Sequence, residues 1–214
     1  FEANAKVVIV PETALPAFLD QLPPDYMESL TKDARRTGKD ILLGTVERSV
    51  RDGAYDYYNS LVRITGDHRE SYRKRHLVPF GEYIPPGFGW VLAILHIPMS
   101  DFSRGTATQP PLEAGGARFG VAICYEDMYG GEVIDQLPAA QVLVNVSNDA
   151  WFGDSLEPTQ HLQASQMRAL ETGRWMVRST NTGVTAAIDE QGRVVSSLPG
   201  FRRGTLVADV VPRD

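Results

Sequence analysis

Short runs of β-branched and aliphatic residues recur along the chain, and most are bounded by Gly, Pro, Asn or Asp. Residues 6–10 (KVVIV) are apolar without interruption after the lysine, which is typical of a strand covered on both faces. The boundaries and the β-branched content together predict strands rather than buried helices. The runs that predict strands in this part of the chain are 6–10, 41–46, 57–64, 119–124 and 142–146.

Two longer segments have the period of a helix. Residues 24–37 carry Tyr26, Leu30 and Ala34 at spacings of four, and Gly38 follows as a natural stop. Residues 158–173 have the same character. After them the pattern returns to strands, with a turn at 189–192; the expected strands are 175–180, 184–188, 194–197 and 205–211.

The alternation of strands and helices predicts an α/β layered fold, with helices outside and sheets inside. We find no internal repeat and no linker, so residues 1–214 are expected to form one domain. Residues 79–105 fit neither period and are rich in Pro, Gly and aromatic residues. They predict a long excursion from the core, a kind of segment that is commonly functional.

The composition argues against several classes of function. Apolar residues make up 43% and charged residues 22%, and the net charge is −6, which disfavours nucleic acid as a partner. The single cysteine, Cys124, excludes an internal disulfide framework and any multi-thiolate zinc site. The longest apolar run, 88–95 (FGWVLAIL), is too short to span a bilayer but long enough to lie against its surface.

Cys124 ends the run FGVAIC and is followed by Tyr-Glu-Asp and then Gly130 and Gly131. A strand of small residues that leads into a sharp turn and a helix is the arrangement of a nucleophile elbow. The alternative is an inert thiol in the core, although the polar residues that follow it disfavour a purely apolar pocket.

A nucleophilic thiol needs a base. No histidine has the setting expected of a Cys–His pair, although such a pair remains open: the four are His68 and His76 in a charged segment, His96 in the excursion and His161 on a polar helix face. Glu12 directly follows the first predicted strand, and a carboxylate in a dry pocket has a raised pKa that suits it to take a thiol proton. An exposed loop glutamate is the alternative for Glu12.

The third candidate is Lys74, within the basic run 73–76. Basic runs usually form solvated faces, and this is the alternative for Lys74. The run leads, however, into an apolar stretch that ends in an isolated acid, Glu82. A buried lysine supplies positive charge to an oxyanion, and a neighbouring glutamate keeps it charged and oriented.

Five motifs together resemble the nitrilase (carbon–nitrogen hydrolase) superfamily, whose catalytic residues are Glu, Lys and Cys in that chain order. Within it the chain most resembles the nitrilase-like domain of the apolipoprotein N-acyltransferase family. The matching motifs are 11–16 (PETALP), 72–85 (YRKRHLVPFGEYIP), 123–127 (ICYED), 145–154 (NVSNDAWFGD) and 178–183 (RSTNTG).

The resemblance implies an α-β-β-α sandwich, here without the strand and helix with which such domains open. It also implies a membrane domain of eight helices upstream of Phe1, so we expect this chain to be a fragment of a longer protein. No cofactor and no metal ion are implied.

By motif, the resemblance implies that Glu12 is the general base, Lys74 the oxyanion stabiliser and Cys124 the nucleophile. Supporting roles are implied for Glu82 beside the lysine, for Glu126, and for Tyr125, whose backbone N–H is a candidate oxyanion donor. Trp151 and Phe152 match a substrate-binding loop, and Trp90 lies in the excursion. For Trp151 and Phe152 a packing role is the alternative, and for Glu126 a structural role is.

The implied reaction moves an acyl chain from a phospholipid, through a cysteine thioester, to the α-amine of a diacylglyceryl-cysteine lipoprotein. The implied location is the periplasmic face of a bacterial inner membrane, and residues 86–99 are expected to form an amphipathic lid on that surface. The alternative functions are a soluble nitrilase-type amidase or carbamoylase with water as acceptor, and a binding module with a degenerate site.

Overall fold

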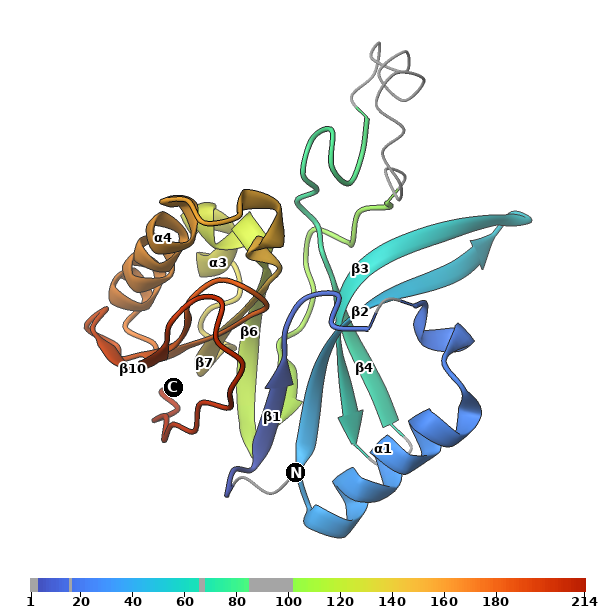
Figure 1. Ribbon diagram of the computed structural model, residues 1–214, viewed down its shortest axis with the longest axis horizontal. Coiled ribbons are helices and arrows are strands. Elements are labelled where there is room, and N and C mark those ends of the chain that lie inside the picture. Colours follow the sequence, from blue (N-terminus) through green and yellow to red (C-terminus); the bar gives the residue numbers. More distant parts are fainter. Residues whose placement is uncertain (1–3, 16, 66–67, 85–101) are drawn as a thin grey trace.

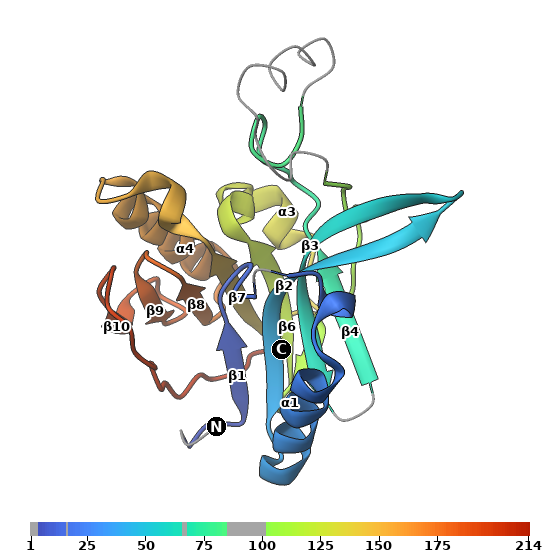
Figure 2. The same cartoon turned by 45° about the vertical axis from the view of Figure 1, so that its right-hand side comes forward.

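The computed structural model describes residues 4–15, 17–65, 68–84 and 102–214. Two β-sheets face each other, with helices on the outer side of each (Figure 1). Turning the molecule shows α1 (Pro24–Thr37) on one outer side and α4 (Glu157–Thr172) on the other (Figure 2). This arrangement confirms the predicted α-β-β-α sandwich.

The first sheet has the strand order β1-β2-β3-β4. β1 runs parallel to β2, and the other neighbours are antiparallel. The strands are β1 (Val7–Val10), β2 (Asp40–Arg51), β3 (Ala54–Thr65) and β4 (His68–Arg73). The hydrophobic pattern did not predict β4. Its sequence, HRESYR, is polar, which an edge strand paired with β3 tolerates.

The second sheet has the order β10-β9-β8-β7-β6-β5. Its centre, β6-β7-β8, is parallel, and the flanking pairs are antiparallel. The strands are β5 (Leu112–Ala114), β6 (Ala117–Ile123), β7 (Val142–Ser147), β8 (Met176–Thr180), β9 (Thr185–Ile188) and β10 (Val194–Leu198).

Helix α1 has the predicted bounds, and Gly38 ends it in the left-handed conformation at φ 66°. α4 ends in the same way at Gly173. Shorter helical elements complete the fold: η1 (Leu19–Gln21), η2 (Cys124–Met128), α3 (Gly130–Ile134) and η3 (Asp149–Phe152).

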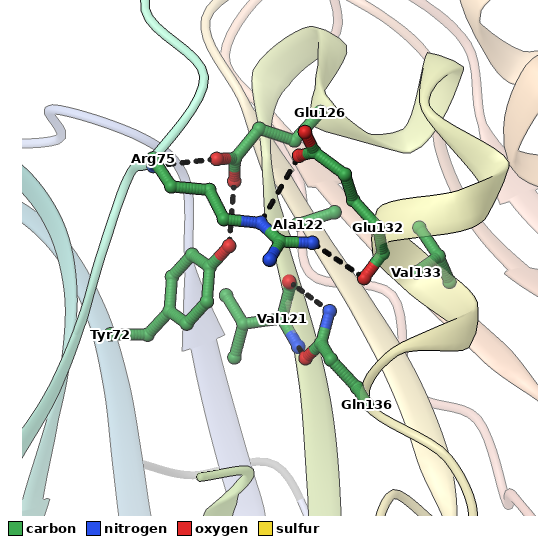
Figure 3. Close-up of a pocket in the computed structure, with 8 residues that line it drawn as sticks. All are labelled: Tyr72, Arg75, Val121, Ala122, Glu126, Glu132, Val133 and Gln136. Atoms are coloured by element: carbon green, nitrogen blue, oxygen red, sulfur yellow. Dashed lines mark hydrogen bonds and ion pairs between the residues drawn. The ribbon is translucent and has the colours of Figure 1, made fainter. Parts of the chain in front are cut away.

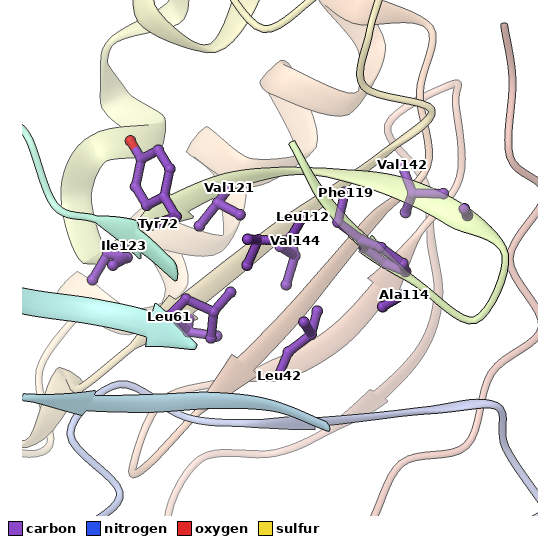
Figure 4. Close-up of a cluster of buried hydrophobic side chains, with 12 residues drawn as sticks. Leu42, Leu61, Tyr72, Leu112, Ala114, Phe119, Val121, Ile123, Val142 and Val144 are labelled. Carbon is purple, nitrogen blue, oxygen red and sulfur yellow. The ribbon is translucent and has the colours of Figure 1, made fainter. Parts of the chain in front are cut away.

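Alternation along the strands separates the core into layers. In β2, Leu42 points between the sheets and packs with Leu61, Phe119 and Val144 (Figure 4). Its neighbours Ile41 and Leu43 belong to the cluster on the side of α1. A third cluster, which includes Leu143, Ala169 and Met176, joins the second sheet to α3 and α4. The two sheets therefore enclose one hydrophobic core, and the ends of their strands lie at the rim of the sandwich.

The strand predicted over 205–211 is absent. These residues form no strand pairing with any described residue, and their apolar pattern reflects packing of Val210 against the core between the sheets.

The excursion 79–105 is described only at its base. There Phe102 N donates to Glu82 O at 2.9 Å, and Ser103 N donates to Tyr57 O at 2.7 Å. Trp90 and the lid 86–99 lie outside the described residues. Among the described helices, none is long and apolar enough to cross a membrane.

Candidate active site

Three of the predicted site residues lie at strand ends along one rim of the sandwich. Glu12 follows β1, Lys74 follows β4 and Cys124 follows β6. The strand end that carries Glu12 passes close to β2, because Gly44 has no side chain: a Cβ there would collide with the carbonyl oxygen of Pro11. β1 and β4 belong to the first sheet and β6 to the second, so the packing of the two sheets brings together residues that are far apart in the chain.

Lys74 lies between two carboxylates. Its Nζ is 3.4 Å from Glu12 Oε1 and 2.9 Å from Glu82 Oε2. The exposed fraction is 1% for Lys74 and 5% for Glu12, so this ionic cluster is shielded from water. The solvated-face alternative for Lys74 and the exposed-loop alternative for Glu12 are thus both wrong.

Two asparagines that sequence reasoning did not select complete the cluster. The amide of Asn59 donates to Glu12 Oε1 at 2.6 Å and to Glu82 Oε1 at 2.7 Å. The backbone N–H of Asn148 donates to Glu12 Oε2 at 2.7 Å. A single asparagine inside the strand β3 was the only local signal for Asn59, and it is a weak one.

Cys124 has the backbone of a nucleophile elbow. It follows β6, begins η2 and has φ 56°, a conformation that side chains other than glycine seldom adopt. Burial and the charge of Glu12 raise the pKa of its thiol to about 12, against the lowering effects of Lys74, Ser147 and the backbone N–H of Tyr125. The thiol therefore stays protonated at neutral pH until a base removes its proton.

The ammonium of Lys74 stays charged. Burial lowers its pKa, but the negative charges of Glu12 and Glu82 and the hydrogen bond to Glu82 outweigh that effect, and the net pKa is raised. A fixed positive charge beside a partly buried thiol is suited to stabilise negative charge that develops during a reaction.

Glu126 joins the backbone around Cys124 to the backbone around Lys74. Its carboxylate accepts from the N–H of Arg75 at 2.8 Å and from the hydroxyl of Tyr72 at 3.2 Å (Figure 3). It also accepts from the N–H groups of Ile123 and His76 at 2.8 and 3.0 Å. Burial raises its pKa to about 7 although these backbone hydrogen bonds lower it. These contacts support the structural alternative for Glu126: it orients the residues on both sides of it.

The segment that follows Lys74 is also anchored to α3. Arg75 NH2 donates to the carbonyl of Glu132 at 2.7 Å, and its Nε lies 3.1 Å from the carboxylate of the same residue (Figure 3). Gln136 forms hydrogen bonds with both backbone groups of Val121 in β6. The segment that carries Lys74 and the strand that leads to Cys124 are therefore held by α3 and by the turn that follows it.

Tyr125 and the aromatic loop lie around this centre. The ring of Tyr125 is 5.5 Å from Lys74 Nζ, and its hydroxyl donates to Leu77 O at 2.6 Å. Trp151 and Phe152, in η3, are 77% and 49% exposed, so neither is a core packing residue. A substrate-binding role for them stays a prediction.

The histidines do not act on the thiol through any contact that the structure describes. His161, expected on a polar helix face, is buried, and its Nε2 lies 3.2 Å from the carbonyl oxygen of Cys124. His76 stacks on the ring of Tyr129, with 3.7 Å between ring centroids. His96 lies outside the described residues.

His161 belongs to a buried charged cluster. Burial lowers its pKa, but hydrogen bonds to Asp127 and Asp149 raise it to about 9. Ligand atoms of Asp149, Glu157 and His161 lie within 4.8 Å of one another. Because Arg178 NH2 is already 2.9 Å from Asp149 Oδ2, we assign no metal ion to this group.

The arrangement of Glu12, Lys74 and Cys124 suits nucleophilic acyl transfer. It offers a thiol, a carboxylate that interacts with it electrostatically, and a buried ammonium for an oxyanion. These are the parts needed to form and break a thioester.

The comparisons with known proteins agree with this geometry. The family model described as carbon-nitrogen hydrolase matches residues 1–214. Among solved structures, the Caenorhabditis elegans NitFhit protein superposes with a TM-score of 0.69 at 21% identity, over 91% of this chain and 50% of that one. Saccharomyces cerevisiae Nit3 superposes with a TM-score of 0.64 at 16% identity, over 91% and 73% of the two chains. These two likenesses concern the fold alone.

Sequence relatives are more similar. The chain is 55% identical over 202 residues to an apolipoprotein N-acyltransferase of Nitrosomonas europaea, a match that covers 94% of this chain and 40% of the relative. It is 46% identical to an apolipoprotein N-acyltransferase of Methylococcus capsulatus, over 98% of this chain and 41% of the relative. The chain thus spans about 40% of the length of these relatives.

Proposed function

We propose, since this chain belongs to the carbon–nitrogen hydrolase family, that it is the catalytic domain of an N-acyltransferase that works through a thioester on Cys124. The observation that carries the proposal is the buried cluster of Glu12 and Lys74 beside this cysteine. The names of the relatives supply the acceptor, an apolipoprotein, and the group that is transferred, an acyl group; the phospholipid donor is part of our proposal.

In the first step Glu12 takes the proton of the Cys124 thiol. The high thiol pKa makes a base necessary, and Glu12 raises that pKa by its charge, as a close carboxylate does. Hydrogen bonds from Asn59 and from the backbone of Asn148 hold the Glu12 carboxylate in place. The thiolate then attacks the carbonyl carbon of a phospholipid acyl ester.

The attack creates a tetrahedral oxyanion, which Lys74 and the backbone N–H of Tyr125 stabilise. Glu82, 2.9 Å from Lys74 Nζ, keeps the ammonium oriented and does not touch the substrate. The C–O bond of the ester breaks, the leaving lysophospholipid oxygen takes the proton from Glu12, and the acyl group remains on sulfur as a thioester.

In the second step the α-amine of a diacylglyceryl-cysteine attacks the thioester. Glu12 accepts the proton of the amine and returns it to the departing thiolate, so that the enzyme is restored and an amide is formed. Two half-reactions through one thioester give ping-pong kinetics.

The test uses the full-length protein and phospholipid vesicles without an acceptor. Intact-protein mass is expected to rise by one acyl group, and neutral hydroxylamine is expected to remove it. Cys124→Ser is expected to show no hydroxylamine-labile adduct. Turnover of a lipoprotein peptide by a protein that never carries an acyl group would refute the thioester. Acyl transfer to water alone, with the peptide present, would favour the amidase alternative.

We also propose that residues 86–99 lie on the membrane surface, at the periplasmic face of the inner membrane, and admit lipid to the site. The support is composition, because the segment contains Trp90, Leu92 and Leu95 among other large apolar residues. Replacing these three with Ser is expected to slow acylation of Cys124 from vesicles and to leave acylation by a short-chain water-soluble ester unchanged. A variant that acylates normally from vesicles would refute the lid.

A further inference from the structure

The carbonyl oxygen of Cys124 is held from the outer side of the second sheet by two buried side chains. Asn145 Nδ2 donates to it at 2.8 Å, and His161 Nε2 lies 3.2 Å from it. The same His161 nitrogen is 3.0 Å from Asp127 Oδ1. Since both of its neighbours are acceptors, Nε2 carries a hydrogen and acts as a donor.

Holding this carbonyl also orients the next N–H. The oxygen of Cys124 and the N–H of Tyr125 belong to one planar peptide group. Among the described residues the cis peptide bond is Leu137–Pro138, so this peptide is trans and its C=O and N–H point in opposite directions. While the oxygen points toward Asn145 and His161, the N–H points the opposite way, on the side of the Cys124 thiol, whose pKa it lowers.

The two donors are themselves fixed by a charged network with almost no exposure to water. Arg178 NH1 donates to Asn145 Oδ1 at 2.9 Å, while its NH2 lies 2.9 Å from Asp149 Oδ2. Ser165 donates to the other carboxylate oxygen of Asp127, Oδ2, at 2.6 Å. Each donor therefore has a set orientation, which a positive φ at Cys124 needs in order to persist.

We propose that Asn145 and His161 are positioning residues for the oxyanion site: they hold the Cys124–Tyr125 peptide so that the Tyr125 N–H points at the reacting carbonyl oxygen. This inference rests on the proposed thioester chemistry. Neither side chain touches the substrate. Turning the Tyr125 N–H away also removes its lowering effect on the thiol pKa, which alters every reaction of the thiol alike, so the loss specific to oxyanion-forming steps is read from a ratio of two reactions.

Two reactions of the same thiol separate this role from a merely structural one. Acylation of Cys124 by p-nitrophenyl butyrate passes through a tetrahedral oxyanion and releases p-nitrophenolate. Alkylation by iodoacetamide displaces iodide at a saturated carbon and forms no oxyanion. A general loss of folded enzyme or of thiolate lowers both rates together, whereas a misdirected Tyr125 N–H lowers the ratio of acylation to alkylation.

The variants are chosen for size. Asn145→Asp has the shape of the original and no N–H to donate, and His161→Leu removes the second donor. Each is expected to lower the acylation-to-alkylation ratio of the full-length enzyme about 10–100-fold, less than or close to the loss of one oxyanion donor. The loss is expected in kcat with KM unchanged. His161→Gln, which keeps an N–H donor, is expected to restore most of the ratio.

Thr172→Ala is the matched control, because it removes a side-chain hydrogen bond of the same helix, to Arg168 O at 2.7 Å, that takes no part in holding Asn145 or His161. It is expected to lower the melting temperature and to leave the ratio unchanged. If His161→Leu does not fold, the acylation-to-alkylation ratio of Asn145→Asp tests the inference by itself. A wild-type enzyme that is alkylated but never acylated would refute the proposed function. A wild-type enzyme that is acylated, with an unchanged ratio in a folded Asn145→Asp, would refute this inference alone.

Discussion

Replacing Lys74 with Met removes the ammonium that lies between two buried carboxylates and leaves the volume of the side chain almost unchanged. With Nζ at 3.4 Å from Glu12 and 2.9 Å from Glu82, the two attractions are about 5 and about 6 kcal/mol at an effective dielectric constant of about 20. Desolvation of the buried ions offsets much of this. Breaking such a pair by removing one partner costs about 3–5 kcal/mol, since the remaining charges stay buried.

The expected loss corresponds to a fall in melting temperature of about 6–20 °C for a domain of this size. It is measured by thermal unfolding of the full-length protein, with wild type and variant at the same pH and salt. Acylation of Cys124 is expected to fall by at least about 100-fold, because an oxyanion donor is lost as well.

A second variant separates the two effects. In Lys74→Met the carboxylates of Glu12 and Glu82 are buried without a positive partner. Combining it with Glu82→Gln removes one of these two negative charges, and the oxygen of the new amide still accepts from Asn59. The double variant is expected to recover about half or more of the lost stability. Its acylation is expected to stay as low as in Lys74→Met, because Glu82 acts only through the lysine.

Glu82→Gln alone is the control, and it is expected to be milder than Lys74→Met in both measurements. Two results would refute the reasoning. A melting temperature of Lys74→Met within about 2 °C of wild type would mean that the variant leaves no buried negative charge without a partner. Recovery of acylation in the double variant would mean that Lys74 does not stabilise the oxyanion.

Three further predictions concern other parts of the site. The pKa of Glu126 is about 7 in the folded protein and about 4.3 when unfolded, so the folded state binds its proton more tightly and stability is expected to fall as pH rises between these values, at no more than about 1.4 kcal/mol per pH unit. Urea unfolding of wild type and Glu126→Gln across this range measures it, and an equal slope in both would contradict it. Gly44→Ala is expected to displace Glu12 and to lower both melting temperature and acylation, at a cost of about 1–3 kcal/mol. Gly131→Ala, where a Cβ meets nothing within 4 Å, is the control that should change neither, and equal behaviour of the two would count against the close approach. Trp151→Ser is expected to change stability by less than about 0.5 kcal/mol, since the ring is largely exposed. It is expected to slow acylation from vesicles but not by p-nitrophenyl butyrate, and a loss with both would place Trp151 at the reacting centre.

Local pattern was sufficient for much of the fold. Helix α1 has the predicted bounds because Pro24 and Gly38 determine where it begins and ends through backbone conformation alone. The continuous apolar run before Glu12 predicted a strand covered on both faces; the strand is there, but as the edge strand β1 it is only partly buried. The small residues before Cys124 predicted the elbow, and the positive φ of Cys124 agrees with it. These signals are short-range, so a single sequence contains them.

The tertiary structure decided the surroundings of the polar residues. A basic run such as 73–76 has the same local pattern whether it is solvated or buried. Only the tertiary packing puts Lys74 between Glu82, eight residues along the chain, and the distant Glu12. The same holds for Asn59, which donates to both, and for His161, which was expected at a helix surface. A buried polar group is stable only with partners, and those partners come from other strands and helices. Their identity is therefore a property of the assembled sheets, which no window of the sequence contains.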